Sequence, residues 1–564
     1  MLSVSIGCHS DAGHKEENQD YVAAHVPDGP ALQYKGIVAV IADGISTSEH
    51  SRQAAQIAVT QFIEDYYATS ELLSVHRAAS DVLSATNHWL YTAGVGRGCD
   101  MDRGWVTTFS AFILRHHTCY WIHCGDTRLY RLRQGGLQQL SRDHQQWQGN
   151  QYYLSNALGI QPRLNVDTDS TDIQPQDVFL LLSDGVYDVL SPAQILLVVQ
   201  SEPSENNAAC ELVRLALEQG SQDNLTAQVV RVLDTGSEKE APHDEALLPC
   251  LPVMSVGDEV DGFRILCLLH QSARSCVYKA IHHTSGKTVI IKAPSVDMSD
   301  DHTHLQQLLN EQWIARRINS RFVQKACEVA GPKTALYSVL EYCEGITLAQ
   351  WFNDNPTASF AIIRDIVEQV GKGVLALNRR QVIHGDIRPE NILINAHRQC
   401  VLIDLGNARV GGTSDLFDVI AVRPGAAMYT APEYFLGYEP DEQADQYSLA
   451  VLTYYLCSQR FPYAGDVPKA NSLLAQRRLR YRSVISQSTT VPVWLDTTLK
   501  KATQCEPHRR YTDIGEYLHF IFHPDPAFSG RFIPIMQRHP VRFWQTISGL
   551  LTLCIFLLLA QQFG

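Results

Sequence analysis

The hydrophobic positions divide the chain into two globular patterns. Residues 1 to about 234 alternate short apolar runs with polar turns and end in a strand-like run from Leu225 to Leu233. From residue 258 a second pattern begins with strands and becomes rich in helical periodicity after about Ala358. Residues 235–257 carry prolines and charges without an apolar period, which is typical of a linker. We therefore predict domains at 1–234 and 258–524, joined by a linker at 235–257.

A third pattern occupies the C-terminal end. The run FWQTISGLLTLCIFLLLA, from Phe543 to Ala560, has no formal charge, and as a helix it would measure about 27 Å, enough to span a bilayer. Arg538 and Arg542 precede it, so the positive-inside tendency keeps the domains in the cytoplasm. We expect a juxtamembrane segment at 525–542 and a single transmembrane helix at 543–562 in the inner membrane. A buried core helix or an oligomerisation helix is the alternative.

Composition and charge narrow the class of protein. The chain has 564 residues, 45% hydrophobic and 19% charged, which suffices for two or three buried cores. The formal net charge of −14 argues against binding to nucleic acid, which needs a basic face. The 14 cysteines form no CxxC pair and have no regular spacing, which favours reduced thiols over disulfides or a zinc site.

In the first domain, carboxylates lie at the ends of predicted strands. The runs IVAVIADG and DVFLLLSDG lead into Asp43 and Asp184, whereas Asp223 immediately precedes the strand LTAQVVRV. An antiparallel arrangement would bring Asp223 to the same sheet end, and Asp20 leads into an early strand. A lone Asp-Gly pair is more often a turn former. Four converging carboxylates repel one another and favour hard divalent cations, Mg²⁺ or Mn²⁺, which can activate water against a phosphomonoester.

These carboxylates belong to an ordered series of motifs. SDAGHKEENQD, ADG, GWVTTFSA, CGDTRLY, LSRDH, LLSDG and SQDNLT follow one another across residues 1–234, and the series resembles that of the type 2C metal-dependent protein phosphatases. The resemblance implies a β-sandwich flanked by helices. It also implies two metal ions held by Asp20, Asp43, the Gly44 carbonyl, Asp184 and Asp223, and a third, weaker metal at Asp126. Lys15 stands where the family usually has an Arg that grips the substrate phosphate.

The second domain contains the residues that phosphoryl transfer from ATP requires. VIHGDIRPENILI places Asp386 and Asn391 five residues apart, and VLIDLG places Asp404 after an apolar strand. TVIIK presents Lys292 on a strand, and Glu311 follows it in a run with helical spacing. This series resembles eukaryotic-like serine/threonine protein kinases over about residues 258–522.

The kinase resemblance implies a bilobal fold and a role for each of these residues. Asp386 would orient the attacking hydroxyl, Asn391 and Asp404 would hold Mg²⁺ on ATP, and Lys292, paired with Glu311, would hold the α and β phosphates. Arg388 would keep a positive charge near the transferred phosphate. Arg510 is expected to pair with Glu433 in the helical lobe.

Three departures from the kinase pattern leave an alternative open. His270, Ser272 and Ser275 occupy the glycine positions of the loop over the ATP phosphates. Gly385 replaces the Arg that receives an activation-loop phosphate, and Ala426 replaces the usual Thr before the APE motif. The second domain could therefore be an active kinase or a pseudokinase kept for binding.

Together these features predict a bifunctional, membrane-tethered signalling enzyme. We expect it to phosphorylate Ser or Thr on proteins with ATP and to remove phosphate from phosphoserine and phosphothreonine. The alternative is a phosphatase whose kinase-like half only binds nucleotide or recruits substrate. We expect autophosphorylation, with four candidate sites: Thr235, Ser237, Thr413 and Ser414.

Overall fold

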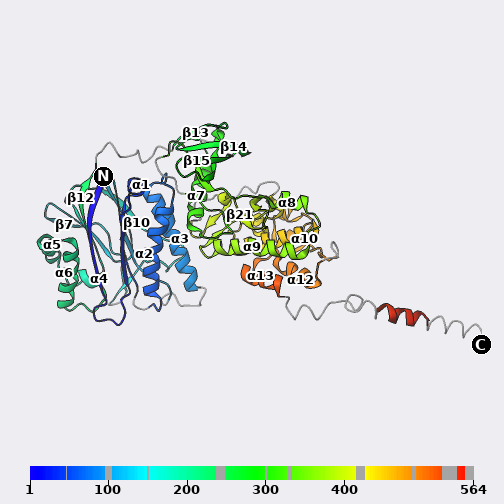
Figure 1. Cartoon of the computed structure of the whole chain (residues 1–564). Coiled ribbons are helices and arrows are strands. Elements are labelled where there is room, and N and C mark those ends of the chain that lie inside the picture. Colours follow the sequence, from blue (N-terminus) through cyan, green and yellow to red (C-terminus); the bar gives the residue numbers. More distant parts are fainter. Residues whose placement is uncertain are drawn as a thin grey trace, which may run out of the picture.

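The computed structural model describes most of the chain as two domains that lie side by side (Figure 1). The described residues are 1–45, 48–95, 104–148, 151–236, 248–298, 301–327, 333–413, 426–485, 491–523 and 543–552.

The first domain is built on two antiparallel five-stranded sheets. One sheet has the order β1 (Leu2–Asp11), β12 (Leu225–Thr235), β11 (Val178–Leu182), β6 (Arg128–Arg133) and β7 (Gly136–Gln139). The other has the order β10 (Asp167–Asp172), β5 (Thr118–Cys124), β4 (Phe109–Arg115), β3 (Ile37–Asp43) and β2 (Asp20–His25). The predicted β-sandwich is thus confirmed.

The central strands are apolar throughout because both of their faces are covered. In β11, Phe179 and Leu181 point into the core between the sheets, while Leu180 and Leu182 point the other way. That outer face packs against α4 (Asp184–Tyr187), α5 (Pro192–Ser201) and α6 (Glu205–Glu218). The outer face of the second sheet packs against α2 (Ser51–Ala68) and α3 (Val75–Val95). The resemblance predicted flanking helices, and the structure has them on both sides.

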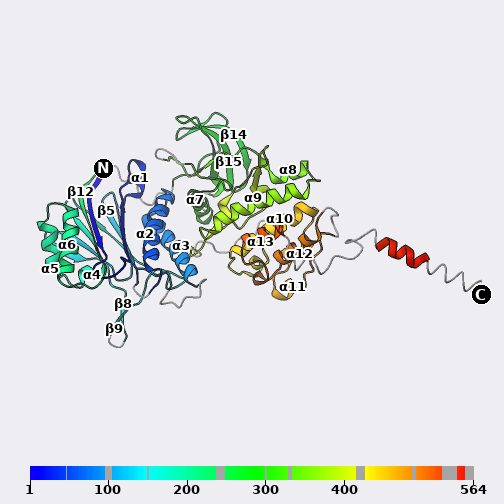
Figure 2. The same ribbon diagram turned by 60° about the horizontal axis from the view of Figure 1, so that its bottom comes forward.

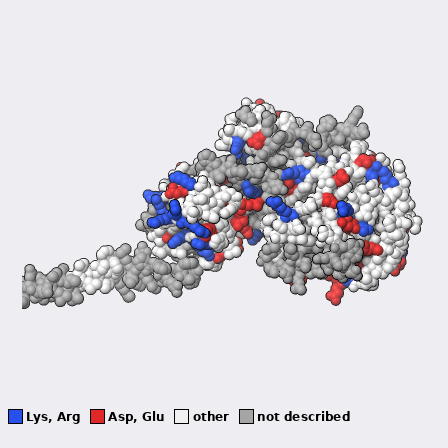
Figure 3. Space-filling model, turned by 180° about the vertical axis from the view of Figure 1, so that it is seen from behind, with Lys and Arg blue, Asp and Glu red and all other residues white. Residues whose placement is uncertain are grey.

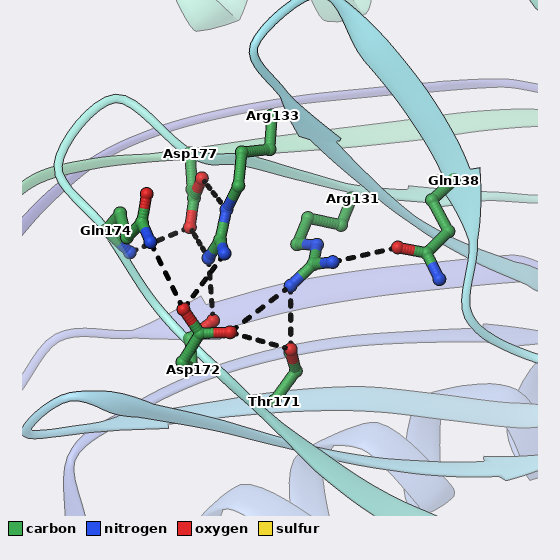
Figure 4. A network of polar contacts seen from close by, with 7 residues as sticks. All are labelled: Arg131, Arg133, Gln138, Thr171, Asp172, Gln174 and Asp177. Atoms are coloured by element: carbon green, nitrogen blue, oxygen red, sulfur yellow. Dashed lines mark hydrogen bonds and ion pairs between the residues drawn. The ribbon is translucent and has the colours of Figure 1, made fainter.

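A polar network ties the two sheets together at one edge (Figure 4). Arg133 of β6 contacts Asp177 at 2.6 Å and Asp172 of β10 at 2.9 Å. Its neighbour Arg131 donates to Thr171 of β10 at 2.7 Å. Because β6 and β10 belong to different sheets, these arginines hold the sandwich closed where the apolar core ends.

Smaller elements complete this domain. The helix α1 (Pro30–Lys35) precedes β3, and the hairpin of β8 (Gln145–Gln148) and β9 (Gln151–Leu154) projects from the body of the domain (Figure 2). Gln145 at the base of this hairpin lies near the carboxylate end of the sheets, as described below.

The second domain has the two lobes that the sequence predicts. The N-terminal lobe is a five-stranded sheet of β13 (Glu259–Val260), β14 (Phe263–Gln271), β15 (Ser275–His282), β16 (Thr288–Pro294) and β17 (Ser338–Glu341), with the helix α7 (His302–Arg317). The helices of the other lobe are α8 (Leu348–Asp354), α9 (Phe360–Asn378), α10 (Glu442–Ser458), α11 (Leu473–Arg477), α12 (Val493–Ala502) and α13 (Ile514–Phe522). Short paired strands flank the residues of the catalytic-loop motifs: β18 (Ile346–Thr347), β20 (Ile392–Ile394) and β21 (Cys400–Leu402), and β19 (Val382–Ile383) with β22 (Arg409–Val410).

A buried ion pair holds the helical lobe together. Arg510 donates to both carboxylate oxygens of Glu433, at 2.8 and 2.6 Å, and to the backbone oxygen of Gln443. The predicted pairing of Arg510 with Glu433 is therefore confirmed.

The C-terminal end of the predicted linker is packed against both domains. Residues 237–247 lie outside the described part of the chain. Leu248 and Cys250 pack in a cluster with leucines of both domains, and Leu251 is buried against the N-terminal lobe. The end of the linker therefore belongs to the packed structure, although its sequence lacks an apolar period.

The predicted membrane segment is described only in part. Residues 543–552 are helical, and the remainder of the segment, 553–562, lies outside the described residues, as do residues 525–542. Among the described helices, none is long and apolar enough to cross a membrane. On the second domain, Lys and Arg side chains gather toward the left of the view in Figure 3. The exposed basic residues of this domain include four arginines between residues 477 and 482: Arg477, Arg478, Arg480 and Arg482.

Candidate active sites

In the first domain, the structure brings the predicted carboxylates to one end of the sandwich. Asp20 begins β2 and Asp43 ends β3, and the two residues are direct partners in the antiparallel register. Asp184 follows β11, and Asp223 precedes the antiparallel strand β12. The two sheets therefore each contribute two carboxylates, in the arrangement that the strand-end pattern predicted.

The backbone around these carboxylates is tightly fixed. The Asp43 carbonyl accepts hydrogen bonds from the Thr107 hydroxyl at 2.9 Å and the Thr108 amide at 2.8 Å. The Asp43 amide donates to the Thr108 hydroxyl at 2.9 Å. A Cβ atom at Gly185 would lie 2.1 Å from the Asn224 carbonyl oxygen. Glycine after Asp184 thus lets the chain before β12 approach closely.

Mutual repulsion and burial raise the pKa values of this cluster. Burial, together with Asp20, Asp184 and Asp126, raises the pKa of Asp43 well above its usual value. Burial and the neighbouring Asp126, Asp223 and Asp20 raise the pKa of Asp184 to about 7. The carboxylates therefore lie close enough to repel one another, and the protein supplies too little positive charge nearby to offset this repulsion.

The donor set fits a hard divalent cation. Asp20 accepts from the Thr226 hydroxyl at 2.6 Å through Oδ2, while its Oδ1 is buried without a hydrogen-bond partner. Buried carboxylate oxygens of this kind are suited to Mg²⁺ or Mn²⁺. Within the described ranges, however, no three His, Cys, Asp or Glu side chains are assembled closely enough to form a complete ligand group. The site supplies the right donor atoms without presenting a preassembled ligand set.

Lys15 and Asp126 lie at the edges of this cluster. The Lys15 ammonium contacts the Asp223 carboxylate, so the predicted phosphate-binding lysine lies beside a predicted metal ligand. Asp126 accepts from Gln145 of the projecting hairpin at 3.1 Å, and its backbone oxygen accepts from Tyr187 at 2.9 Å. Burial raises the pKa of Asp126, and the hydrogen bond from Gln145 opposes the rise.

Several supporting residues were not identified from the sequence. Thr226 orients Asp20, and Asn224 donates to the backbone oxygens of Ala12 and Glu17 at 2.9 and 3.1 Å. Asn224 thereby fixes the loop that carries Lys15. Both residues lie within the motif SQDNLT, so their proximity to Asp223 in the sequence was the available signal.

In the second domain, three charged side chains meet between the lobes. The Lys292 ammonium of β16 lies 2.8 Å from Glu311 of α7 and 2.7 Å from Asp404. Burial opposes protonation of Lys292, but Asp404 and Glu311 outweigh it and raise the lysine pKa. The predicted pairing of Lys292 with Glu311 is confirmed. Asp404 has a left-handed backbone conformation with φ 64°, which turns its carboxylate toward Lys292.

The catalytic-loop residues are held by a dense set of hydrogen bonds. Asn391 donates to the Asp386 backbone oxygen and to its carboxylate, both at 2.9 Å. Asn407 donates to the same carboxylate at 3.3 Å. Asn407 was not identified from the sequence, and it supplies a second side-chain donor to the Asp386 carboxylate beside Asn391. Gly385 has φ 72°, a conformation that suits glycine better than the usual Arg.

Two features bear on how nucleotide and substrate would bind. Arg388 contacts Glu390 at 2.9 Å, so its positive charge is already paired. The turn between β14 and β15 is closed by Ser272, whose hydroxyl accepts from the Ser275 amide at 3.1 Å. A serine hydroxyl thus closes this turn at a position where the kinase pattern has glycine.

The candidate autophosphorylation sites differ in accessibility. Thr413 is buried and donates to the Val410 backbone oxygen at 2.8 Å, which argues against its use in this conformation. Thr235 is half-buried at the end of β12. Ser237 and Ser414 lie outside the described residues.

Comparison with known protein families assigns both sites to a class. Residues 9–234 match the family model of protein phosphatase 2C, and residues 268–522 match that of the protein kinase domain. The chain therefore carries a protein phosphatase 2C domain followed by a serine/threonine protein kinase domain of the bacterial type.

Individual relatives match one domain at a time. A probable serine/threonine-protein kinase of Clostridium acetobutylicum is 25% identical over 244 residues, 43% of this chain and 36% of that protein. The kinase PrkC of Bacillus subtilis is 24% identical over 259 residues, 46% of this chain and 40% of PrkC. The chain thus spans less than half the length of these curated relatives.

Solved structures also resemble single domains. PppA, a regulatory component of the type VI secretion system in Pseudomonas aeruginosa, is 25% identical with a TM-score of 0.36, covering 41% of this chain and 99% of its own. The kinase domain of Mycobacterium tuberculosis PknI is 20% identical with a TM-score of 0.38, covering 49% of this chain and all of its own.

Proposed function

We propose that this chain is a bifunctional signalling enzyme that removes phosphate from phosphoserine and phosphothreonine and phosphorylates Ser or Thr of proteins with ATP. The observation that carries the proposal is the presence of two catalytic sets in one chain. Four carboxylates lie at the same end of the sandwich, and Lys292, Glu311 and Asp404 are in contact between the kinase lobes.

In the phosphatase site, each residue has a proposed role. Asp20, Asp43, the Gly44 carbonyl, Asp184 and Asp223 would hold two Mg²⁺ or Mn²⁺ ions, and Asp126 would hold a third. Such ions, when bound, supply Lewis-acid activation of water for attack on phosphorus. Lys15 would bind the phosphate oxygens as a point charge, because an ammonium lacks the bidentate fork of Arg. Thr107 and Thr108 keep Asp43 in place by fixing its backbone.

In the kinase site, Asp386 would orient the substrate hydroxyl and accept its proton. Lys292, held by Glu311, would bind the α and β phosphates of ATP, and Asn391 and Asp404 would carry Mg²⁺. Arg388 would stabilise the transferred phosphate after leaving Glu390, which lies at an exposed position. Asn391 and Asn407 fix the Asp386 carboxylate in advance.

A phosphatase with an inactive, nucleotide-binding kinase fold is the second candidate. It is favoured by the serine-closed turn at Ser272 and by the pairing of Arg388 with Glu390. Both features would weaken phosphate binding without disturbing the fold.

The phosphatase activity is tested with a phosphothreonine peptide and the full chain. We expect Mn²⁺-dependent release of phosphate that Asp43→Asn abolishes. The matched control is Asp169→Asn, because Asp169 is an exposed carboxylate on β10 of the same domain. Release that is independent of metal, or that survives in Asp43→Asn, would rule out the proposed site.

The kinase activity is tested by transfer of labelled phosphate from ATP to the chain itself or to a generic protein. The phosphatase is silenced with Asp43→Asn so that product is not removed. We expect transfer that Asp386→Asn abolishes and that Asp365→Asn, an exposed position on α9, leaves intact. Binding of magnesium-ATP without transfer would favour the second candidate.

We also propose that residues 543–562 anchor the enzyme to the inner membrane with both domains in the cytoplasm. The proposal is supported by the uncharged run from Phe543 to Ala560 and by Arg538 and Arg542 before it. The exposed arginines at 477–482 would favour an anionic membrane surface. Fractionation should place the full chain in the membrane and a chain ending at Arg542 in the soluble fraction. Equal distribution of the two would contradict the anchor.

A further inference from the structure

The middle of the helix α7, which carries Glu311, is buried on every side. All residues from Leu308 to Ala315 are buried, a stretch of more than two helical turns. The stretch includes the polar residues Asn310 and Gln312. A helix on the surface of a domain buries only one face. Figures 1 and 2 show why both faces are covered here, since α2 of the phosphatase domain lies alongside α7.

The first half of α7 contacts the phosphatase domain through apolar side chains. Leu305, Leu308 and Leu309 are buried in one cluster, against which Leu72 and Leu73 of the phosphatase domain pack. Leu248 and Cys250 of the linker pack against the same cluster. Burial of several leucines is a large favourable contribution to docking, because each removes apolar surface from water.

The second half of α7 is held by charge. Arg317 forms an ion pair with Asp65 of α2 at 2.9 Å, and each side chain is only 5% exposed. Arg316 contacts Glu71 at 2.9 Å and donates to the backbone oxygen of Ala68, the last residue of α2. Arg316 thus also complements the negative end of the α2 helix dipole. Loss of one partner of the buried Arg317–Asp65 pair would leave a charge buried and uncompensated.

A second kinase element also contacts the phosphatase domain. Gly411 and Gly412 follow β22 in the segment after Asp404, and both lie against α3. A Cβ atom at Gly412 would lie 2.3 Å from the Ser84 backbone oxygen, and one at Gly411 would lie 2.4 Å from the His88 ring. These distances leave no room for any side chain at Gly412 while the domains are docked.

These contacts act on the two elements that set the geometry of the kinase site. Glu311 lies in the middle of α7, between the leucine contacts and the arginine contacts, and it is the partner of Lys292. A helix moves as a rigid rod, so contacts at both ends fix the position of Glu311.

We propose that the phosphatase domain is a built-in positioning partner of the kinase domain, with Asp65 and Arg317 as positioning residues that keep Glu311 against Lys292. The inference rests on the proposed kinase function for its catalytic consequence. Its structural claim, that docking of the phosphatase domain fixes the conformation of α7, does not depend on kinase activity.

The first test replaces Asp65 in the full chain and measures both domains. Asp65→Ala should speed amide hydrogen exchange across residues 308–317 about ten-fold or more. In the Asp43→Asn background it should lower kinase turnover about ten-fold, while KM for ATP changes less. Phosphatase turnover of Asp65→Ala, measured in a chain that keeps Asp43, should stay within about two-fold of that of the unmodified chain. This result would show that the phosphatase domain is folded. Glu64→Ala is the matched control, because Glu64 is the exposed neighbouring acid on the same helix.

A second variant separates docking from folding on the kinase side. Gly412→Ala introduces the clash with Ser84, and it should produce the same exchange and turnover changes as Asp65→Ala. Gly437→Ala controls for backbone strain, because Gly437 has a similar φ of 72° and a Cβ atom added there would meet no other atom within 4 Å. The double variant that combines Asp65→Ala with Arg317→Ala should have a kinase turnover within about two-fold of that of either single variant, because both substitutions remove the same ion pair.

The outcomes distinguish this inference from the proposed kinase activity. If the unmodified chain transfers no phosphate, the kinase proposal fails, and faster exchange in α7 of Asp65→Ala still supports docking as the positioning device. Unchanged exchange in α7 for both Asp65→Ala and Gly412→Ala overturns the inference. If the unmodified chain does transfer phosphate, equal transfer by these variants and by Glu64→Ala and Gly437→Ala also overturns the inference.

Discussion

Asp20 and Asp43 face each other directly across the antiparallel pair of β2 and β3, where Asp20 is buried and Asp43 is half-buried. Like charges at opposed positions of a strand pair destabilise the sheet. Burial raises the pKa of each group, and the Asp20 charge adds to the rise at Asp43. A strained arrangement of this kind is expected where function, rather than stability, has selected the residues.

The first prediction follows from this repulsion. Asp43→Asn keeps the size of the side chain and removes its charge, so at pH 8 in the presence of a chelator it should raise the free energy of unfolding by about 1 to 2 kcal/mol. The same variant should lose phosphatase activity, because an amide is a poorer ligand for a divalent cation. Urea unfolding followed by fluorescence measures the first effect.

The control and the metal dependence belong to the same experiment. Asp169→Asn, at an exposed position, should leave the unfolding midpoint unchanged. Added Mn²⁺ should raise the midpoint of the unmodified chain and have less effect on Asp43→Asn, because ligand binding stabilises only the state that binds it. Destabilisation by Asp43→Asn in chelator would contradict the repulsion argument.

The second prediction concerns the ion pair of the helical lobe. Arg510 and Glu433 are 0% and 4% exposed, and the contact is bidentate. Arg510→Ala leaves Glu433 buried without a partner and should destabilise the domain by about 3 to 5 kcal/mol. Arg510→Lys should be intermediate, because Lys keeps the charge but loses the fork.

An exposed pair in the same lobe provides the comparison. Lys469 and Asp466 are 79% and 54% exposed, so Lys469→Ala should not move the thermal midpoint. A midpoint for Arg510→Ala equal to that of Lys469→Ala would show that the buried pair contributes nothing.

The sequence was sufficient where local pattern decides structure. An apolar run that ends in Asp predicted a buried strand that delivers a carboxylate, and the register places Asp43 opposite Asp20 as a result. The helical spacing around Glu311 likewise predicted the helix α7, and the kinase resemblance implied the pairing of Glu311 with Lys292 that the structure contains. In each case the position of the functional residue follows from the element that carries it.

The sequence was insufficient where contacts form between distant segments. Asp65 and Arg317 are charged residues on helices, and such residues normally face solvent. Their burial results from the docking of two domains, which leaves no periodic signal in either helix. Asn407 was missed for a similar reason, because its contact with Asp386 spans 21 residues and depends on the turn after Asp404.

The third prediction concerns the turn over the nucleotide site. Replacing His270, Ser272 and Ser275 together by Gly removes the Ser272 hydroxyl that closes the turn. The backbone amide of residue 275 then loses this hydrogen-bond acceptor. The backbone could then approach the ATP phosphates more closely, so KM for ATP should fall several-fold with a smaller change in turnover. Ser285→Gly is the control, because Ser285 accepts a similar backbone hydrogen bond in the next turn, between β15 and β16. An unchanged KM for the triple variant would show that the turn does not limit ATP binding.

The fourth prediction concerns acid stability of the phosphatase domain. His123 is buried between the Ser110 hydroxyl, at 2.8 Å from Nδ1, and the Arg142 backbone oxygen, to which Nε2 donates at 2.9 Å. Burial and the nearby His144 lower the pKa of His123 from 6.5 to about 4. The unfolded chain therefore takes up a proton at this ring before the folded chain does. The stabilisation is complete above pH 6.5 and is lost as the pH falls toward 4, by about 3 kcal/mol in total.

The variant His123→Gln isolates this contribution, since an amide can accept from Ser110 and donate to Arg142 without titrating. Urea unfolding at intervals between pH 7 and 4 should show a shallower loss of stability in His123→Gln than in the unmodified chain. His508→Gln should leave the slope unchanged, because His508 is exposed in the kinase domain. Because the slope of stability against pH counts the protons bound on unfolding, equal slopes for all three chains would mean that His123 does not titrate between the folded and unfolded states.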